Sequence, residues 1–97
     1  MILANKERLD SFKSKHPAYA GAIDGWKQTV EAADWSNPQD VKDTFGGRVD
    51  FVKKQTVFDV HGNKVRIVTK IVYQAVKIVN VTHVLDHAEY DKEKWKE

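Results

Sequence analysis

The spacing of apolar residues changes near residue 48, and this change constrains the fold more than any other feature. Before it, apolar side chains recur every three to four residues, as in Ala22, Ile23, Trp26, Val30 and Ala33, which is the spacing of one buried helix face. After it, β-branched residues dominate and the period shortens towards two, which favours strands. Helices followed by strands predict an α+β fold, with N-terminal helices packed on one face of an antiparallel sheet.

Capping residues mark where three helices should begin. Asn5 can cap a helix over residues 6–15, because its side-chain oxygen can accept an amide hydrogen of the first turn. Pro17 suits the first turn of a second helix, since a prolyl nitrogen carries no hydrogen that would stay unsatisfied there. Asn37 as cap and Pro38 in the first turn predict a short third helix.

Strands are expected at residues 2–3, 48–52, 56–61, 64–73 and 76–84. Alternate side chains of a strand point to opposite faces, so the strand at 64–73 divides into two sets. One set is mainly apolar and suits the helices: Val65, Ile67, Thr69, Ile71 and Tyr73. The other set places Lys64, Arg66 and Lys70 beside Val68 and Val72. The second face therefore offers cations to an anion.

Length and composition exclude several classes of protein. A chain of 97 residues can bury one modest core and is too short for two, so we expect residues 1–97 to form a single domain. No apolar run approaches the roughly 20 residues of a membrane span, and no signal-peptide pattern follows Met1, so we expect a cytoplasmic protein with no membrane partner. The absence of cysteine excludes disulfides, thiolate nucleophiles and cysteine-based zinc sites.

Positive charge is concentrated in the predicted β half. Residues 48–83 hold seven Lys and Arg against two acids, whereas residues 1–47 hold six against seven. A basic sheet face suits nucleic-acid phosphate, although lysines also occur on any solvated face. For Lys53, Lys54 and Lys77, simple exposure to solvent explains the lysine about as well as RNA binding does. Simple exposure explains Arg66 less well, because its planar guanidinium is predicted in the middle of a strand.

Reactive side chains gather where the last predicted strand ends, in the segment His-Val-Leu-Asp-His-Ala-Glu-Tyr-Asp-Lys at residues 83–92. Metal-independent RNA cleavage needs a base for the 2′-hydroxyl proton, an acid for the leaving oxygen and cations for the phosphate. His87 and Tyr90 suit the two proton transfers, and Lys64 and Arg66 suit the charge stabilisation. This segment is therefore the candidate active site, and no cofactor is expected.

Two other interpretations of these residues stay open. His87 and Tyr90 could simply anchor the end of the chain by hydrogen bonds. Alternatively, His83 and His87 with a nearby acid could hold a metal ion, although the His-Glu-x-x-His pattern of helical zinc sites is absent. A chelator that leaves cleavage unchanged would exclude the metal-dependent alternative.

Two motifs resemble the HigB family of toxins. Residues 56–67, Thr-Val-Phe-Asp-Val-His-Gly-Asn-Lys-Val-Arg-Ile, are similar to the central hairpin of that family, commonly T-V-F-N/D-I-x-G-N-K-Y-R-L. Residues 83–92, followed by Trp95, resemble its C-terminal H-V-L-T-H-A-E-Y-D-K with a tryptophan soon after. Apolar positions of the helical half also match, so the likeness spans nearly the whole chain.

The resemblance implies a RelE-like fold and a toxin of a type II toxin–antitoxin pair that cleaves translated mRNA, commonly on the ribosome. It also implies an antitoxin partner of the HigA kind with a helix-turn-helix. The resemblance and the basic strand face together indicate candidate residues for catalysis and for RNA binding. The catalytic candidates are His87, Tyr90, Arg66 and Lys64, and the RNA-binding candidates are Asn63, Lys64, Arg66, Lys70 and Lys92.

Three residues depart from the pattern of the family. Val65 replaces the usual tyrosine, Asp86 replaces the usual threonine, and Thr82 stands where a basic residue is frequent. Asp86 beside His87 could orient the imidazole ring or repel the substrate phosphate. Because of these departures, two alternatives stay open. The protein could be an enzyme of reduced activity, or a module of the same fold that binds RNA or an antitoxin without useful catalysis.

Overall fold

The structure is a computed structural model that describes residues 1–62 and 64–92. Predictions that concern Asn63 and Trp95 lie outside the described residues. The elements follow the chain as β1 (Ile2–Ala4), α1 (Glu7–Lys15), the 3-10 turn η1 (Pro17–Tyr19), α2 (Ala20–Ala32), α3 (Pro38–Phe45), η2 (Gly46–Arg48), β2 (Val49–Val52), β3 (Gln55–Val60), β4 (Val65–Val72), β5 (Ile78–Asp86) and α4 (His87–Asp91). The predicted α+β fold is confirmed.

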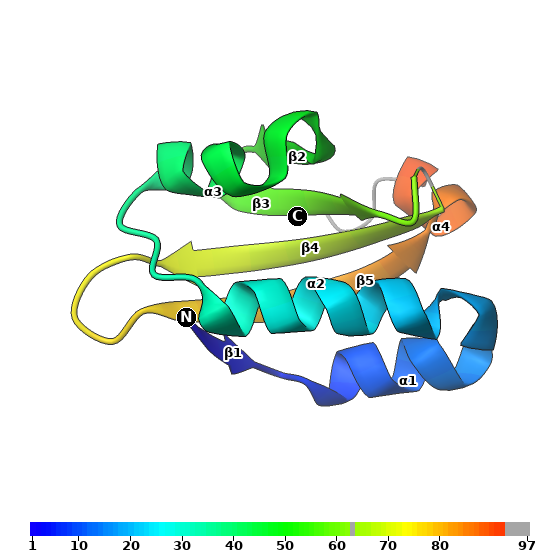
Figure 1. Cartoon of the computed structure of the whole chain (residues 1–97). Helices are drawn as coiled ribbons and strands as arrows, with labels where there is room; N and C mark the ends of the chain where they lie inside the picture. Colours follow the sequence, from blue (N-terminus) through cyan, green and yellow to red (C-terminus); the bar gives the residue numbers. More distant parts are fainter. Residues whose placement is uncertain (63, 93–97) are drawn as a thin grey trace.

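The five strands form one sheet in the order β1-β5-β4-β3-β2. Strands β2 to β5 make an antiparallel meander, as predicted, and β1 adds a parallel edge beside β5 through pairs such as Ile2 with Ile78. Strand β5 continues to Asp86, two residues beyond its predicted end. The site described below is built at this extension, where α4 begins at the end of β5 (Figure 1).

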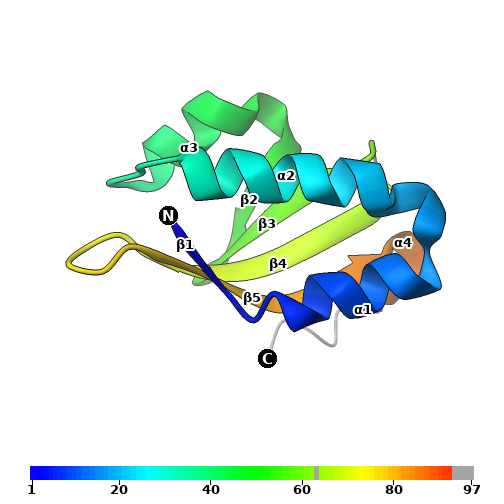
Figure 2. The same ribbon diagram turned by 60° about the horizontal axis from the view of Figure 1, so that its bottom comes forward.

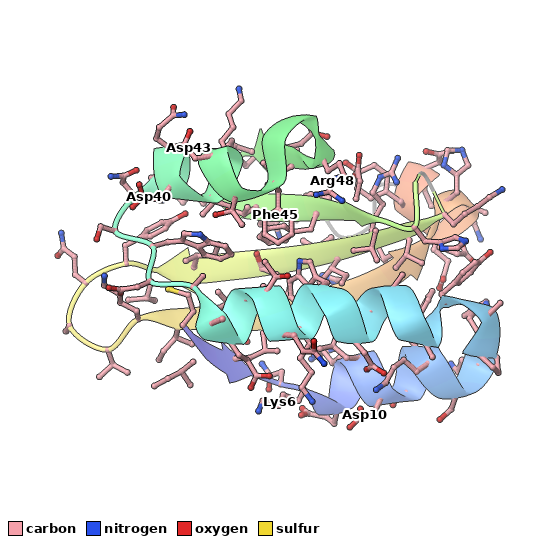
Figure 3. All side chains as sticks on the ribbon, viewed as in Figure 1. Lys6, Asp10, Asp40, Asp43, Phe45 and Arg48 are labelled. Atoms are coloured by element: carbon pink, nitrogen blue, oxygen red, sulfur yellow. The ribbon has the colours of Figure 1, made fainter. Side chains whose placement is uncertain are left out.

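Helices α2 and α3 cover one face of the sheet, which we call the inner face, and α1 lies along the edge of the sheet beside β5 (Figures 1 and 2). The main core lies beneath them and includes Trp26, as predicted, and also Trp35, each 3% exposed. Phe45 points from α3 towards the sheet and joins Phe58 at a ring-centroid distance of 5.0 Å (Figure 3). Burial of this aromatic and aliphatic surface is the main force that holds the helices on the sheet.

The two predicted caps have different outcomes. Asn37 caps α3 as predicted, because its Oδ1 accepts a hydrogen bond from the Asp40 amide at 3.0 Å. The prediction for Asn5 is wrong, because Lys6 occupies the N-cap position of α1. Asn5 instead adopts a φ of 64° where the chain leaves β1, and its side chain donates to Asn80 on β5. Asn5 therefore serves the turn after β1 and the long-range contact with Asn80, and it does not cap α1.

The predicted alternation along β4 is confirmed. Val65 and Ile67 are fully buried in the core under the helices, whereas Val68 packs against Val57 on the opposite, outer face. Arg66 lies between Val65 and Ile67 in the strand and therefore points to the outer face.

A β-bulge interrupts the pairing of β4 with β5. His83 stands opposite Val68, but Val81 stands opposite Thr69, so Thr82 is the extra residue. The Thr82 hydroxyl donates to the Val68 carbonyl at 3.0 Å, which holds the bulge. Because directly opposed residues share a face, the bulge turns His83 to the outer face together with Val68.

Across residues 1–62 and 64–92, no helix combines the length and apolar character that crossing a bilayer requires.

Candidate active site

Arg66 and Asp59 form an ion pair on the outer face of the sheet. They are direct partners in the β3–β4 register, and Arg66 Nε lies 3.0 Å from Asp59 Oδ1. Both side chains are mostly buried, with 11% of Arg66 and 17% of Asp59 exposed. Burial raises the pKa of the Asp59 carboxyl above its usual value, and the Arg66 charge opposes this shift. The guanidinium is thus held in place by a neighbouring strand.

Tyr90 from α4 covers this ion pair. The guanidinium carbon of Arg66 lies 5.1 Å from the centroid of the Tyr90 ring, a cation–π distance. The same ring packs with Leu85 against Val57 and Val68 on the outer face. A cation from the central hairpin and a phenol from the C-terminal segment therefore meet, as the sequence hypothesis requires.

His87 opens α4 and stays largely exposed. Its side chain is 61% exposed, and its Nε2 lies 3.1 Å from Asp91 Oδ2, one helical turn further along. Residues three apart lie on the same side of a helix, so His87 and Tyr90 share a side of α4. The arrangement presents an accessible imidazole, oriented by a carboxylate, beside the phenol that covers Arg66.

Asp86 explains why β5 turns into a helix at this point. Its carboxylate accepts a hydrogen bond from the Glu89 amide at 2.8 Å, and the Glu89 carboxylate accepts one from the Asp86 amide at 3.1 Å. These reciprocal bonds make a capping box, which satisfies amide groups at the start of α4. A threonine can provide the same side-chain acceptor, so aspartate at this position preserves the cap.

Removing the cap should weaken the site. We expect Asp86→Ala to destabilise α4 by about 1 kcal/mol and to lower activity about fivefold, because α4 carries both His87 and Tyr90. Asp86→Thr keeps the acceptor and is expected to behave like the parent protein in urea unfolding and in RNA cleavage. Equal losses in both variants would show that the carboxylate charge matters, and not the cap.

The other predicted site residues that the structure describes are three exposed lysines. Lys64 is exposed directly before β4, and Lys92 is exposed directly after α4. Lys70 is exposed on the outer face but lies four residues from Arg66, which is about 13 Å along a strand. The structure therefore separates Lys70 from the centre formed by Arg66 and Tyr90.

The histidines proposed for a metal site lie in different elements, with His83 on β5 and His87 on α4. Among residues 1–62 and 64–92, no group of three or more His, Asp or Glu side chains is arranged to hold a metal ion.

Two acidic residues that pair with the site residues Arg66 and His87 were not identified from the sequence. Asp59 pairs with Arg66, and Asp91 pairs with His87. Signals for both are present in the chain, because the short turn between β3 and β4 makes Asp59 and Arg66 cross-strand partners, and Asp91 follows His87 by one helical turn. A third feature, the turn of His83 to the outer face, depends on the bulge and has no comparable signal.

Comparisons with known proteins identify the family of the chain. Residues 19–93 match the family model HigB_toxin, described as the RelE-like toxic component of a toxin–antitoxin system. The chain is 29% identical over 94 residues to mRNA interferase HigB of Escherichia coli O6:H1, covering 95% of this chain and 90% of the relative. It is 26% identical over 93 residues to mRNA interferase toxin HigB of Escherichia coli K12, covering 94% and 88%. The match to the family model spans well over half of the chain, which therefore belongs to the HigB toxin family of RelE-like toxins.

Proposed function

We propose that this protein is an endoribonuclease toxin that cleaves translated mRNA without a metal ion. The observation that carries the proposal is the contact between Arg66 and Tyr90, with the exposed His87 on the same side of α4. It joins a fixed cation to two groups capable of proton transfer. The relatives named mRNA interferase support RNA as the substrate.

In the proposed reaction, the 2′-oxygen of the RNA attacks the adjacent phosphorus while the bond from phosphorus to the 5′-oxygen breaks. His87 and Tyr90 carry the two proton transfers, one from the 2′-hydroxyl and one to the leaving 5′-oxygen. Donation of Nε2–H to Asp91 would leave Nδ1 of His87 as the nitrogen that exchanges the proton. Arg66 and Lys64 would stabilise and hold the phosphate, Asn63 and Lys92 would help to bind the RNA, and Lys70 would contact RNA further along.

The partners follow from the family. A toxin–antitoxin component requires an antitoxin, and we propose a HigA-like protein with a helix-turn-helix that silences the toxin by covering its basic outer face. The substrate would be mRNA held on the ribosome, which places the activity in the cytoplasm.

The chemistry of the cut ends tests the proposal even in translation extracts that contain magnesium. Attack by the 2′-oxygen leaves a 5′-hydroxyl and a 2′,3′-cyclic phosphate, so we expect these ends on an mRNA incubated with the protein. Replacing the attacking 2′-hydroxyl with hydrogen should prevent the cut. Comparing translated with untranslated mRNA decides the role of the ribosome. Cuts that end in a 5′-phosphate would contradict the mechanism, and retained RNA binding without any cuts would favour a binding module.

A further inference from the structure

A groove of about 490 Å³ lies beside the candidate active site. Its walls come from α1, from the end of β5 and from α4, and include Arg8, Phe12, Lys15, His16, His83 and Glu89. The groove exists because β1 is short. Its pairing with β5 ends at Ala4 and Asn80, and beyond that point α1 lies along β5 in place of a strand. The volume is in the range of pockets that hold small ligands.

His83 enters this groove because of the bulge at Thr82. Without the extra residue, the alternation set by Val79 and Val81 would turn His83 towards the buried inner face. Bulges often redirect a side chain next to a functional site. The sequence therefore inserts one residue into β5, and the result is an imidazole placed in a groove.

The groove around His83 contains cations that can contact a phosphate group. Burial lowers the pKa of His83, and the positive charges of Arg8 and Lys70 lower it further, which favours the neutral ring. Two acids also line the groove, Glu7 and Glu89, and the Glu89 carboxylate accepts a hydrogen bond from the Asp86 amide. Cations, acceptors and an imidazole together suit a nucleotide better than a simple anion.

The groove is continuous with the candidate active site. Leu85, which lines the groove, stands directly opposite Arg66 in the sheet. Glu89 lines the groove from α4, next to Tyr90 in sequence. An RNA strand with its scissile phosphate near Arg66 and His87 would therefore reach the groove with a neighbouring nucleotide.

We propose that this groove binds one unpaired nucleotide of the RNA beside the scissile phosphate, with Arg8 contacting the phosphate and His83 contacting the base. The proposal rests on the proposed function and adds a subsite to it. Recognition of an unstacked base in such a subsite would give the enzyme a base preference at one position next to the cut.

A binding measurement tests the groove without requiring cleavage. The probe is a single-stranded RNA 12-mer of mixed sequence with 2′-O-methyl groups, which cannot attack the phosphate, titrated by fluorescence anisotropy. We expect Arg8→Ala and His83→Ala each to weaken binding about fivefold or more. The matched control is Lys42→Ala, which removes an exposed cation from α3, over β2 at the far edge of the sheet, and its affinity should stay within about twofold of the parent.

Sequencing of the cut ends provides the second readout. We expect His83→Ala to flatten the base preference at one position beside the cut, while the chemistry of the ends is unchanged. Unchanged affinity in both Arg8→Ala and His83→Ala would overturn the subsite, and so would an unchanged preference in His83→Ala. If the parent protein makes no cuts, the proposed function fails, and the anisotropy titration alone decides whether the groove binds RNA.

Discussion

Replacing His87 with alanine is expected to slow mRNA cleavage by about 10²- to 10⁴-fold, which is the usual contribution of one general acid or base. The fold should survive, because the His87 side chain is 61% exposed and Asp91, with which it pairs, is equally exposed. Single-turnover cleavage of a translated mRNA measures the rate, and urea unfolding checks stability. A loss of rate without a loss of stability assigns His87 to the chemistry.

Tyr90→Phe is the matched test of the second proton-transfer group. It removes the phenolic hydroxyl and keeps the ring that covers Arg66 and packs against Val57 and Val68. We expect a loss of rate of the same order as for His87→Ala, whereas Tyr90→Ala would also uncover the ion pair. Rates near that of the parent in both His87→Ala and Tyr90→Phe would remove α4 from the active site.

Arg66 needs a different control, because its removal has two consequences. Arg66→Ala removes a cation from the site and also leaves the mostly buried Asp59 carboxylate without that charge. Adding Asp59→Asn to Arg66→Met removes both charges while keeping much of the side-chain volume. A double variant that is stable but slow would show that the Arg66 charge serves the reaction and not only the fold.

Local patterns in the sequence were sufficient to predict much of the fold and of the candidate site. The alternation along 64–73 placed Arg66 on the face opposite the helices, because a period of two is fixed by the geometry of a strand. The caps were less certain guides: Asn37 caps α3, but Asn5 pairs with Asn80 across the sheet. A cap is a local preference of about 1 kcal/mol, which a long-range contact can override.

The features that the sequence did not reveal depend on pairing between distant strands. The bulge at Thr82 arises from the register of β5 against β4, and only that register turns His83 to the outer face. The contact of Tyr90 with Arg66 similarly requires α4 to fold back over the sheet. Motif matching placed these residues in one family pattern, but the partners of each side chain come from tertiary packing.

The largest loss of stability is expected at Phe58, in the middle of β3. Its side chain is fully buried, and its ring centroid lies 5.0 Å from that of Phe45, 5.3 Å from Trp26 and 6.3 Å from Trp35. Phe58→Ala should therefore leave a cavity that α2 and α3 both line, at a cost of about 3–5 kcal/mol. A protein of this length has a total stability of roughly 5–15 kcal/mol, so much of the variant should be unfolded under mild conditions.

Phe51 on the neighbouring strand β2 is the matched control, because the same side chain is 44% exposed there. In urea unfolding we expect Phe58→Ala to lower the midpoint strongly with little change in slope, and Phe51→Ala to cost less than about 1 kcal/mol. Similar midpoints for the two variants would contradict the aromatic core described above. The Phe58→Ala and His87→Ala variants should also lose cleavage for different reasons. Phe58→Ala should lose cleavage in proportion to the unfolded fraction, whereas His87→Ala should lose cleavage while it stays folded.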